Sequence, residues 1–368
     1  MKPKIKYRKA KLADIDRLVQ IENECFNYDQ LDAKKFKYFI EKGHDDLVVQ
    51  TVDDTISSYG LLLYRRGTSL SRLYSIAVSK SYRGKSLGEA LLKSLETFSS
   101  DNDSSYIRLE VKASNKPAIK LYEKLGYNRF AIKHQYYDND EDAICFEKKV
   151  QVIGKKEKKL NVPFYKQTTE FTCGPSSLMM AMKTLDQNTK ITRAKEIEIW
   201  REATTIFMTS GHGGCGPHGL AISAHKRGFR VELLLVTKEL LFVTGVRQKV
   251  KKDIIKIVQE QFNEQIKEKN IPVIYGKISW TDVDNIIKNN GIAIILINSY
   301  RLTESNTPHW VVLTGMNEDF LFFHDPYVEE DDSIFTNTNI PIRRDEFEMM
   351  TKKGSKQILS LVAIYPGK

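Results

Sequence analysis

The stretch RLYSIAVSKSYRGKSLGEALLKSLE, residues 72–96, decides how the first half of the chain folds. An apolar segment, residues 73–78, runs into a short basic turn, residues 83–88, and then into a segment with apolar residues at helical spacing. This order predicts a strand, a loop and a helix. Small residues in such a turn let the backbone approach an anion, and the helix N-terminus adds N–H groups and a favourable dipole. A simple helix cap would also explain the turn, so taken alone it leaves an anion site open.

A second strand–loop–helix unit follows at residues 107–127. Strand residues 107–111 lead through Ser114 and Asn115 to a helix that begins near Pro117 and continues into LYEKLGY. Further strands are expected on both sides of these two units, with a helix over residues 14–26. The first half therefore predicts an α+β domain built on a mixed sheet.

Together the two units resemble the acetyl-CoA loop and the adjacent motif of the GNAT superfamily of N-acetyltransferases, over roughly residues 4–150. The loop pattern of that family is Arg/Gln-x-x-Gly-x-Gly/Ala. Arg83 and Gly88 match it, whereas Ser86 stands where a glycine is usual, and a serine is more restricted in φ. The resemblance implies acetyl-CoA as the cofactor. The implied cofactor-binding residues are Ile76, Ala77, Val78, Arg83, Gly84, Lys85, Ser86, Leu87, Gly88, Asn115 and Tyr122.

The segments LEVKASNKPAIKLYEKLGY, residues 109–127, and YYDNDEDAI, residues 136–144, resemble the bacterial ribosomal-protein N-terminal alanine acetyltransferases. This resemblance implies that Glu110 is the general base, that Tyr122 protonates the departing thiolate, and that Asn115 holds the pantetheine arm. The chemistry is compatible, because an α-amine with a pKa near ~8 loses its proton more readily than a lysine amine near ~10.4. A solvent-facing carboxylate and a packed core aromatic are the structural alternatives for Glu110 and Tyr122.

The chain divides near EKKVQVIGKKEKKLNVP, residues 147–163, which carries six lysines and no apolar helical face. We therefore expect a first domain over residues 1–150, a basic linker over residues 151–160 and a second domain over residues 161–368. In the second domain helical patterns come early and apolar strand patterns come late, which again predicts the α+β class.

In the second half, VPFYKQTTEFTCGPSSLMMAMKTL, residues 162–185, predicts an extended entry and a helix that begins just after Cys173. A cysteine at a helix N-terminus lies at the positive end of the dipole, which favours the reactive thiolate. Gln167 lies six residues earlier, a spacing that lets its amide come beside the sulfur and donate to an oxyanion. A buried structural cysteine is the alternative.

A base and its partner are expected from two late strands. His309 opens the apolar strand HWVVLTG, and Asp325 ends the next strand, sixteen residues later. Adjacent antiparallel strands could bring Asp325 beside the His309 ring and fix its tautomer. The order Gln, Cys, His, Asp is that of papain-like peptidases. The segments QTTEFTCGPSSLMMA, PHWVVLTG and HDP resemble the bacteriocin-processing cysteine peptidases that remove double-glycine leaders, over about residues 160–368.

The rest of the sequence limits cofactors and location. The net charge of +10 can come simply from a lysine-rich composition, or it can serve to attract nucleic acid or acidic peptides. The sequence has no basic stripe interleaved with aromatic residues, so a nucleic acid partner is not required. The four cysteines form no CxxC pair, and the segment GHGGCGPHGLAISAHKRG, residues 211–228, matches no standard zinc spacing, so we expect no metal. Without a signal peptide or a membrane segment, a cytoplasmic location is the default.

These features predict a bifunctional enzyme. The peptidase would cut a peptide precursor of a natural-product pathway, and the transferase would acetylate the N-terminal amine of a peptide or protein. Tethering the two would raise the local concentration of one enzyme's product at the other site. One alternative is an acetyltransferase with a non-hydrolytic peptide-recognition domain. Another retains the thioester chemistry but performs acyl transfer or deamidation.

Overall fold

The computed structural model describes residues 3–137, 140–151, 158–207, 212–243, 246–329, 334–353 and 356–367 of the chain. The chain forms two compact units, Met1–Ile153 and Gly154–Lys368. The boundary between them falls inside the expected linker, of which residues 152–157 lie outside the described residues. Lys158 and Lys159 were also expected in the linker, but they form strand β8 and pair with β12 of the second unit.

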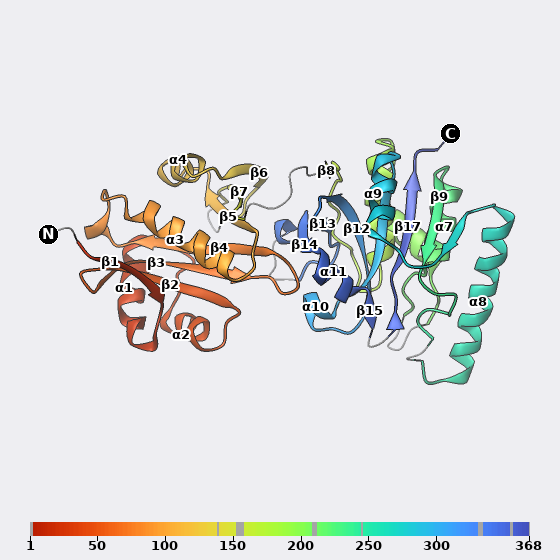
Figure 1. Ribbon diagram of the computed structural model, residues 1–368, viewed down its shortest axis with the longest axis horizontal. Helices are drawn as coiled ribbons and strands as arrows, with labels where there is room; N and C mark the ends of the chain where they lie inside the picture. The colour runs from red at the N-terminus through yellow and green to blue at the C-terminus, as the bar shows by residue number, and fades with distance from the viewer. Residues whose placement is uncertain are drawn as a thin grey trace. The chain divides into compact units, whose positions relative to one another are not determined.

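A seven-stranded sheet forms the centre of the first unit (Figure 1). Its strands are β1 (Ile5–Lys9), β2 (Asp45–Val52), β3 (Thr55–Tyr64), β4 (Leu70–Val78), β5 (Tyr106–Lys112), β6 (Asn128–Lys133) and β7 (Ala143–Lys149). They lie in the order β1-β2-β3-β4-β5-β7-β6. β4 and β5 pair in parallel, whereas the other neighbouring strands pair in antiparallel fashion. The sheet is therefore mixed, as the sequence predicts.

Four α-helices cover the two faces of this sheet. They are α1 (Ile15–Cys25), α2 (Ala33–Glu41), α3 (Leu87–Asp101) and α4 (Lys116–Lys124), with short 3₁₀ turns η1 (Leu12–Asp14) and η2 (Lys80–Tyr82). Apolar residues of α1 and α2 pack with one set of strand residues, and those of α3 and α4 pack with the other set. Alternate residues along β5 consequently point to opposite layers, because successive side chains of a strand face opposite ways.

Strands β4 and β5 separate in the middle of the sheet. They pair only from Leu70–Tyr106 to Leu73–Leu109, although β4 continues to Val78 and β5 to Lys112. The register of β4 against β3 also shifts between Leu73 and Ser75. Beyond Leu73 and Leu109, the facing backbone edges of β4 and β5 no longer pair with each other, so the sheet is open at its centre.

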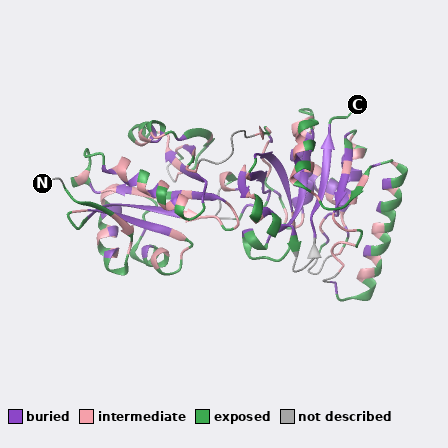
Figure 2. Ribbon diagram, in the orientation of Figure 1, coloured by how far each residue is buried: buried purple, intermediate pink, exposed green. Residues whose placement is uncertain are grey.

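The second unit also contains a layer of sheet between helices. The sheet order is β10-β9-β17-β11-β12-β13-β14, with β8 paired to β12. The strands are β8 (Lys158–Lys159), β9 (Arg230–Leu235), β10 (Val273–Tyr275), β11 (Ile292–Asn298), β12 (Pro308–Met316), β13 (Phe320–His324), β14 (Ile340–Arg343) and β17 (Ser360–Tyr365), and β15 (Lys352–Lys353) pairs with β16 (Lys356–Gln357). Figure 2 shows these strands to be mostly buried.

The helices of the second unit pack on both faces of its sheet. They are α5 (Cys173–Leu185), α6 (Arg193–Ala203), α7 (Pro217–Lys226), α8 (Lys249–Glu268), α9 (Trp280–Lys288), α10 (Tyr300–Thr303) and α11 (Arg344–Met350), with the 3₁₀ turn η3 (Ile334–Thr336). In strand β11, which is apolar from Ile292 to Ile297, Ile294 packs with the α5–α7 side and Ile295 with the α9–α11 side. A strand that is covered on both faces reads as a continuous apolar run, as this one does.

The α+β class predicted for both halves is confirmed. Helix α2 is missing from the sequence-based expectation. Its nine residues place Phe36, Phe39 and Ile40 at helical spacing, so the signal was present, but the segment is short and contains three lysines. Asp32 nevertheless caps this helix by accepting a hydrogen bond from Lys35 N at 2.8 Å.

Candidate active sites

Cys173 is the first residue of α5 and is buried, with an exposed fraction of 9%. Gly174 follows it where space is limited. A Cβ there would lie 3.2 Å from the Trp310 ring and 3.3 Å from Cys215 Cβ, tighter than most real contacts. A glycine therefore lets the start of α5 sit close against β12, which carries the predicted base.

His309 and Asp325 lie side by side, as the sequence predicts. Strands β12 and β13 pair through Val312 and His324, and His309 Nε2 lies 2.7 Å from Asp325 Oδ1. Asp325 is 1% exposed, and its Oδ1 also accepts a hydrogen bond from Tyr327 N at 2.9 Å. Because Nε2 is engaged by the carboxylate, Nδ1 remains for another partner.

Cys173 lies close enough to the His309 ring to raise the pKa of that ring. Burial lowers the pKa of His309, but the charge and hydrogen bond of Asp325, together with the contact to Cys173, raise it to about 10. The ring therefore keeps both protons at neutral pH. An imidazolium beside the sulfur stabilises negative charge there, which is what a thiol nucleophile requires.

Gln167 is buried near this triad, but one of the two N–H groups of its side-chain amide is already hydrogen-bonded. Its backbone N–H donates to Pro326 O at 2.9 Å, which ties it to the residue after Asp325. Its Nε2 donates to Thr169 O at 2.8 Å, which leaves a single amide N–H for an oxyanion. Its buried Oε1 has no hydrogen-bond partner within the described ranges. Such an acceptor is costly unless a ligand N–H reaches it.

Glu196 is a buried residue of this site that sequence reasoning missed. Its carboxylate on α6 is 0% exposed and accepts hydrogen bonds from the loop that carries Gln167 and Cys173. The donors are Tyr165 Oη at 2.9 Å, Thr168 N and Thr168 Oγ1 at 2.8 Å, Thr172 Oγ1 at 2.5 Å and Ser176 Oγ at 3.3 Å. One signal was available: Glu196 lies on the same helical face as the buried Ile199 and Ala203.

The turn predicted to hold the cofactor has the backbone of an anion-binding loop. Gly84 has φ of +77°, and a Cβ added to it would meet nothing within 4 Å, while Ser86 has φ of +58°. Ser86 precedes α3 without a side-chain cap, so the first N–H groups of α3 are not satisfied by that hydroxyl. Arg83 instead turns back and donates to Val78 O at 3.2 Å. This loop fits a pyrophosphate, and Ile76 to Val78 lie on the released part of β4 beside it.

Glu110 lies on β5, one residue beyond the last pair with β4. Its two oxygens are taken by cations, with Arg72 Nε at 2.9 Å and Lys133 Nζ at 2.7 Å. Burial alone would raise the pKa of Glu110, but Arg72 and Lys133 hold it below its ordinary value. Arg72 also donates to Tyr136 Oη at 2.9 Å. The predicted base is therefore a firmly ionised but weakly basic carboxylate.

Tyr122 lies on α4, just before which stands Asn115, and Tyr122 packs in the opposite layer from Glu110. Burial raises the pKa of Tyr122 to about 12, so its phenol keeps its proton at neutral pH and can act as an acid. Its ring packs edge-on to Tyr127 at 5.7 Å between centroids. Asn115 caps α4 by accepting a hydrogen bond from Ala118 N at 3.2 Å through Oδ1.

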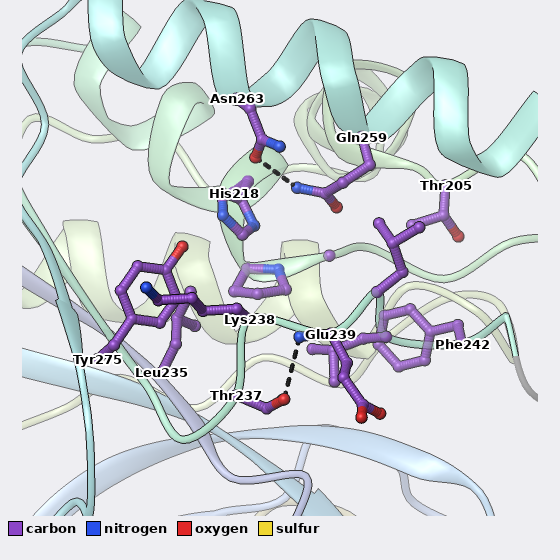
Figure 3. Close-up of a pocket in the computed structure, with 14 residues that line it drawn as sticks. Thr205, His218, Leu235, Thr237, Lys238, Glu239, Phe242, Gln259, Asn263 and Tyr275 are labelled. Carbon is purple, nitrogen blue, oxygen red and sulfur yellow. Dashed lines mark hydrogen bonds between the residues drawn. The ribbon is translucent and has the colours of Figure 1, made fainter.

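The histidine-containing segment after residue 211 contributes Cys215 to the surroundings of Cys173 and His218 to a separate pocket. Cys215 is 2% exposed, and burial followed by the proximity of Cys173 raises its pKa. His218 borders a pocket between the start of α7, the loop after β9 and α8, where Gln259 donates to Asn263 at 2.9 Å (Figure 3). Burial lowers the pKa of His218 to about 4. No cluster of three candidate metal ligands occurs in the part of the chain that the structure describes.

Comparison with known proteins assigns both halves. Residues 7–147 match the acetyltransferase (GNAT) domain, and residues 162–365 match the Peptidase_C39 like family. A Bacillus subtilis protein, provisionally named a [ribosomal protein bS18]-alanine N-acetyltransferase, is 32% identical over 146 residues, which are 39% of this chain and 95% of that protein. An N-alpha-acetyltransferase of Saccharolobus solfataricus is 32% identical over 152 residues, 37% of this chain and 87% of its own. The crystal structure of the ribosomal-protein-S18-alanine N-acetyltransferase from Escherichia coli aligns with 25% identity and a TM-score of 0.38, over 44% of this chain and all of that one.

The chain thus belongs to the GNAT acetyltransferases through its first unit and to the Peptidase_C39 like family through its second. GNAT acetyltransferases use acetyl-CoA, which confirms the predicted cofactor. Among the described residues, no helix is both long enough and apolar enough to cross a bilayer.

Proposed function

We propose that this chain is a bifunctional peptide-modifying enzyme. Its first unit transfers an acetyl group to the N-terminal amine of a peptide or protein, and its second unit cleaves a peptide precursor through Cys173. The observation that carries the second activity is the position of His309, which is hydrogen-bonded to Asp325 and lies close enough to Cys173 for that residue to raise its pKa. The first activity is supported by relatives whose names give protein N-termini as substrates.

In the peptidase, Cys173 Sγ attacks the scissile carbonyl carbon and forms an S–C bond. The peptide C–N bond then breaks as His309 gives its Nδ1 proton to the departing amine. Water adds to the thioester while His309 takes a proton from it, the S–C bond breaks, and Cys173 is restored. Asp325 holds the ring in orientation throughout, and the free amide N–H of Gln167 donates to the developing oxyanion.

In the transferase, bound acetyl-CoA supplies an acetyl group already activated as a thioester. The turn from Arg83 to Gly88 and the N-terminus of α3 would hold its phosphates. Tyr122, which keeps its phenolic proton at neutral pH, donates that proton to the departing sulfur, although burial makes it a weaker acid than a free phenol. Glu110 is the predicted base, but Arg72 and Lys133 take both of its oxygens and make it a weak one.

The alternative is an acetyltransferase whose second unit binds peptides without hydrolysing them. The triad argues against this alternative, because a recognition domain has no need for an imidazolium held between a sulfur and a carboxylate. A double-glycine junction is the cleavage site we propose, on the resemblance of residues 160–368 alone. Transpeptidation or deamidation would use the same thioester, so product analysis must separate them from hydrolysis.

The test incubates the full chain with acetyl-CoA and peptides that carry a free N-terminus and a Gly-Gly junction, followed by mass spectrometry. We expect cleaved and acetylated products from the wild type. Cys173→Ala should abolish cleavage and retain acetylation, while Cys25→Ala, in the other unit, serves as the matched thiol control. Cleavage that persists in Cys173→Ala, or a peptide that binds but is never cut, would overturn the peptidase assignment.

A further inference from the structure

A second carboxylate, Glu22, is buried beneath the acetyl-transfer site. Glu22 lies on α1 and is 2% exposed. Its Oε1 accepts a hydrogen bond from Leu31 N at 2.9 Å, and its Oε2 accepts one from Tyr59 Oη. A carboxylate that is buried without an ionic partner is expensive, so its presence calls for an explanation beyond a single loop contact.

The hydrogen bonds continue from Glu22 toward the opening in the sheet. Tyr59, on β3, is 0% exposed and packs edge-on against Phe36 at 5.4 Å between centroids. Its hydroxyl lies 3.1 Å from Ser75 Oγ. Since Tyr59 donates to Glu22, its oxygen is left to accept a proton from Ser75. Three groups in a row can thus pass a proton inward.

Ser75 is the outer end of this series of hydrogen bonds, and it lies where β4 and β5 separate. It follows the register shift of β4 and lies beyond Leu73, the last residue of β4 that pairs with β5. Ser75 pairs with Leu61 of β3, and the side chain of Leu61 packs in the α1–α2 layer. Paired residues of adjacent strands face the same side, so Ser75 faces the α1–α2 side of the sheet, as do Arg72 and Glu110. Ser75 is also only partly buried.

Glu110 by itself is poorly suited to remove the amine proton. Both of its oxygens are paired with cations, and a proton placed there would have to displace Arg72 or Lys133. Within the described ranges Glu22 makes no ion pair, and its oxygens receive an N–H and a phenol. The protein thus contains one carboxylate whose charge is already balanced by cations, Glu110, and another arranged to accept a proton, Glu22.

We propose that Ser75, Tyr59 and Glu22 form a proton relay for acetyl transfer, which rests on the proposed N-terminal acetyltransferase function. The amine nitrogen loses its proton to Ser75 Oγ as it bonds to the acetyl carbon. The proton of Ser75 moves to Tyr59 Oη, and the proton of Tyr59 moves to Glu22 Oε2. Three O–H bonds form as one N–H and two O–H bonds break, and Glu22 becomes neutral. After product release the proton returns to solvent along the same path.

The surroundings of the relay suit this role. Burial raises the pKa of Glu22, while the Tyr59 hydrogen bond, the Leu31 N–H and the charge of Lys35 on α2 oppose that rise. Burial and the charges of Glu22 and nearby Cys25 raise the pKa of Tyr59, although the Ser75 hydrogen bond opposes this. Tyr59 therefore conducts a proton without ionising, and Glu22 is the base at the end of the relay.

The experiment measures the pH profile of kcat/KM for peptide acetylation by the full chain. Tyr59→Phe and Ser75→Ala each break the relay, and Glu22→Gln keeps an acceptor for Leu31 N while removing the base. Each should lower kcat/KM about 10²-fold near pH 7, with the deficit shrinking above about pH 8 as free amine accumulates. Tyr64→Phe is the matched control, because it removes another hydroxyl of β3 that donates to a carboxylate, Asp46, and we expect less than about a twofold change.

The outcomes separate the two levels of the proposal. Full activity of both Tyr59→Phe and Ser75→Ala beside an active wild type would overturn the relay and leave the acetyltransferase assignment intact. A loss that is equal at every pH, with weaker acetyl-CoA binding, would show that these residues serve structure only, and would also overturn it. A wild type that acetylates no N-terminal amine would overturn the proposed function and the relay with it.

Discussion

Replacing Glu196 by alanine should destabilise the second unit and disorganise its nucleophile together. The carboxylate accepts five hydrogen bonds from residues 165–176, the loop and helix start that carry Gln167 and Cys173. A bond to a charged acceptor is worth about 1.5–3 kcal/mol, but the five share two oxygens and do not add. Glu196→Ala leaves several buried donors without an acceptor, each at about 1–3 kcal/mol and not fully additive, so we expect a loss of about 3–5 kcal/mol.

Tryptophan fluorescence during urea unfolding can isolate this effect. The three tryptophans, Trp200, Trp280 and Trp310, all lie in the second unit, so the signal reports on that unit within the full chain. Glu196→Gln should cost about 1–2 kcal/mol, since the amide keeps one acceptor oxygen and turns a donor toward the other hydroxyl groups.

The matched control is Glu198→Gln on the same helix. Glu198 is 46% exposed and pairs with Lys195, so its replacement should change stability by less than about 0.5 kcal/mol. Peptide hydrolysis should fall in Glu196→Ala even below its unfolding transition, because the loop that positions Cys173 is released. Unfolding of Glu196→Ala within about 1 kcal/mol of the wild type, with unchanged hydrolysis, would refute the positioning role.

Three further predictions concern both sites. Because the pKa of His309 in the folded chain is about 10, against 6.5 ordinarily, its ion pair stabilises the fold fully below about pH 6.5 and loses that contribution as pH rises through about 10. Asp325→Asn should move the alkaline limb of peptide hydrolysis to lower pH, and an unmoved limb would contradict this assignment. Ser86→Gly should relieve a positive φ and raise the stability of the first unit by up to about 1 kcal/mol, measured by calorimetry, with acetyl-CoA affinity retained; a lower stability would count against strain at this turn. Tyr122→Phe should slow acetyl transfer about 10²-fold without weakening acetyl-CoA binding in calorimetric titration, and an unchanged rate would remove Tyr122 from the chemistry.

The juxtaposition of His309 with Asp325 could be predicted because its signals are local. A cysteine at the start of a helix, a histidine at the start of one strand and an aspartate at the end of the next are each visible in a short segment. The hairpin of β12 and β13 then brings His309 and Asp325 together by ordinary antiparallel pairing. The cofactor turn was visible for the same reason.

The parts that could not be predicted depend on distant contacts. Glu196 resembles a surface glutamate of an exposed helix until the loop from residue 165 folds over it. Arg72 and Lys133 approach Glu110 from separate strands, so the weakening of that base has no sequence signature. Likewise, β17, at the end of the chain, lies between β9 and β11 in the middle of the sheet, and no local pattern fixes that position.

The most direct test of the account measures alkylation of Cys173 by iodoacetamide at neutral pH in the wild type and in His309→Ala. Peptide mapping would follow the buried Cys215 in the same samples as an internal reference. We expect fast labelling of Cys173 in the wild type, at least about tenfold slower labelling in the variant, and little labelling of Cys215 in either. Slow labelling of Cys173 at the same rate in both proteins would contradict the imidazolium–thiolate pair on which the peptidase proposal depends.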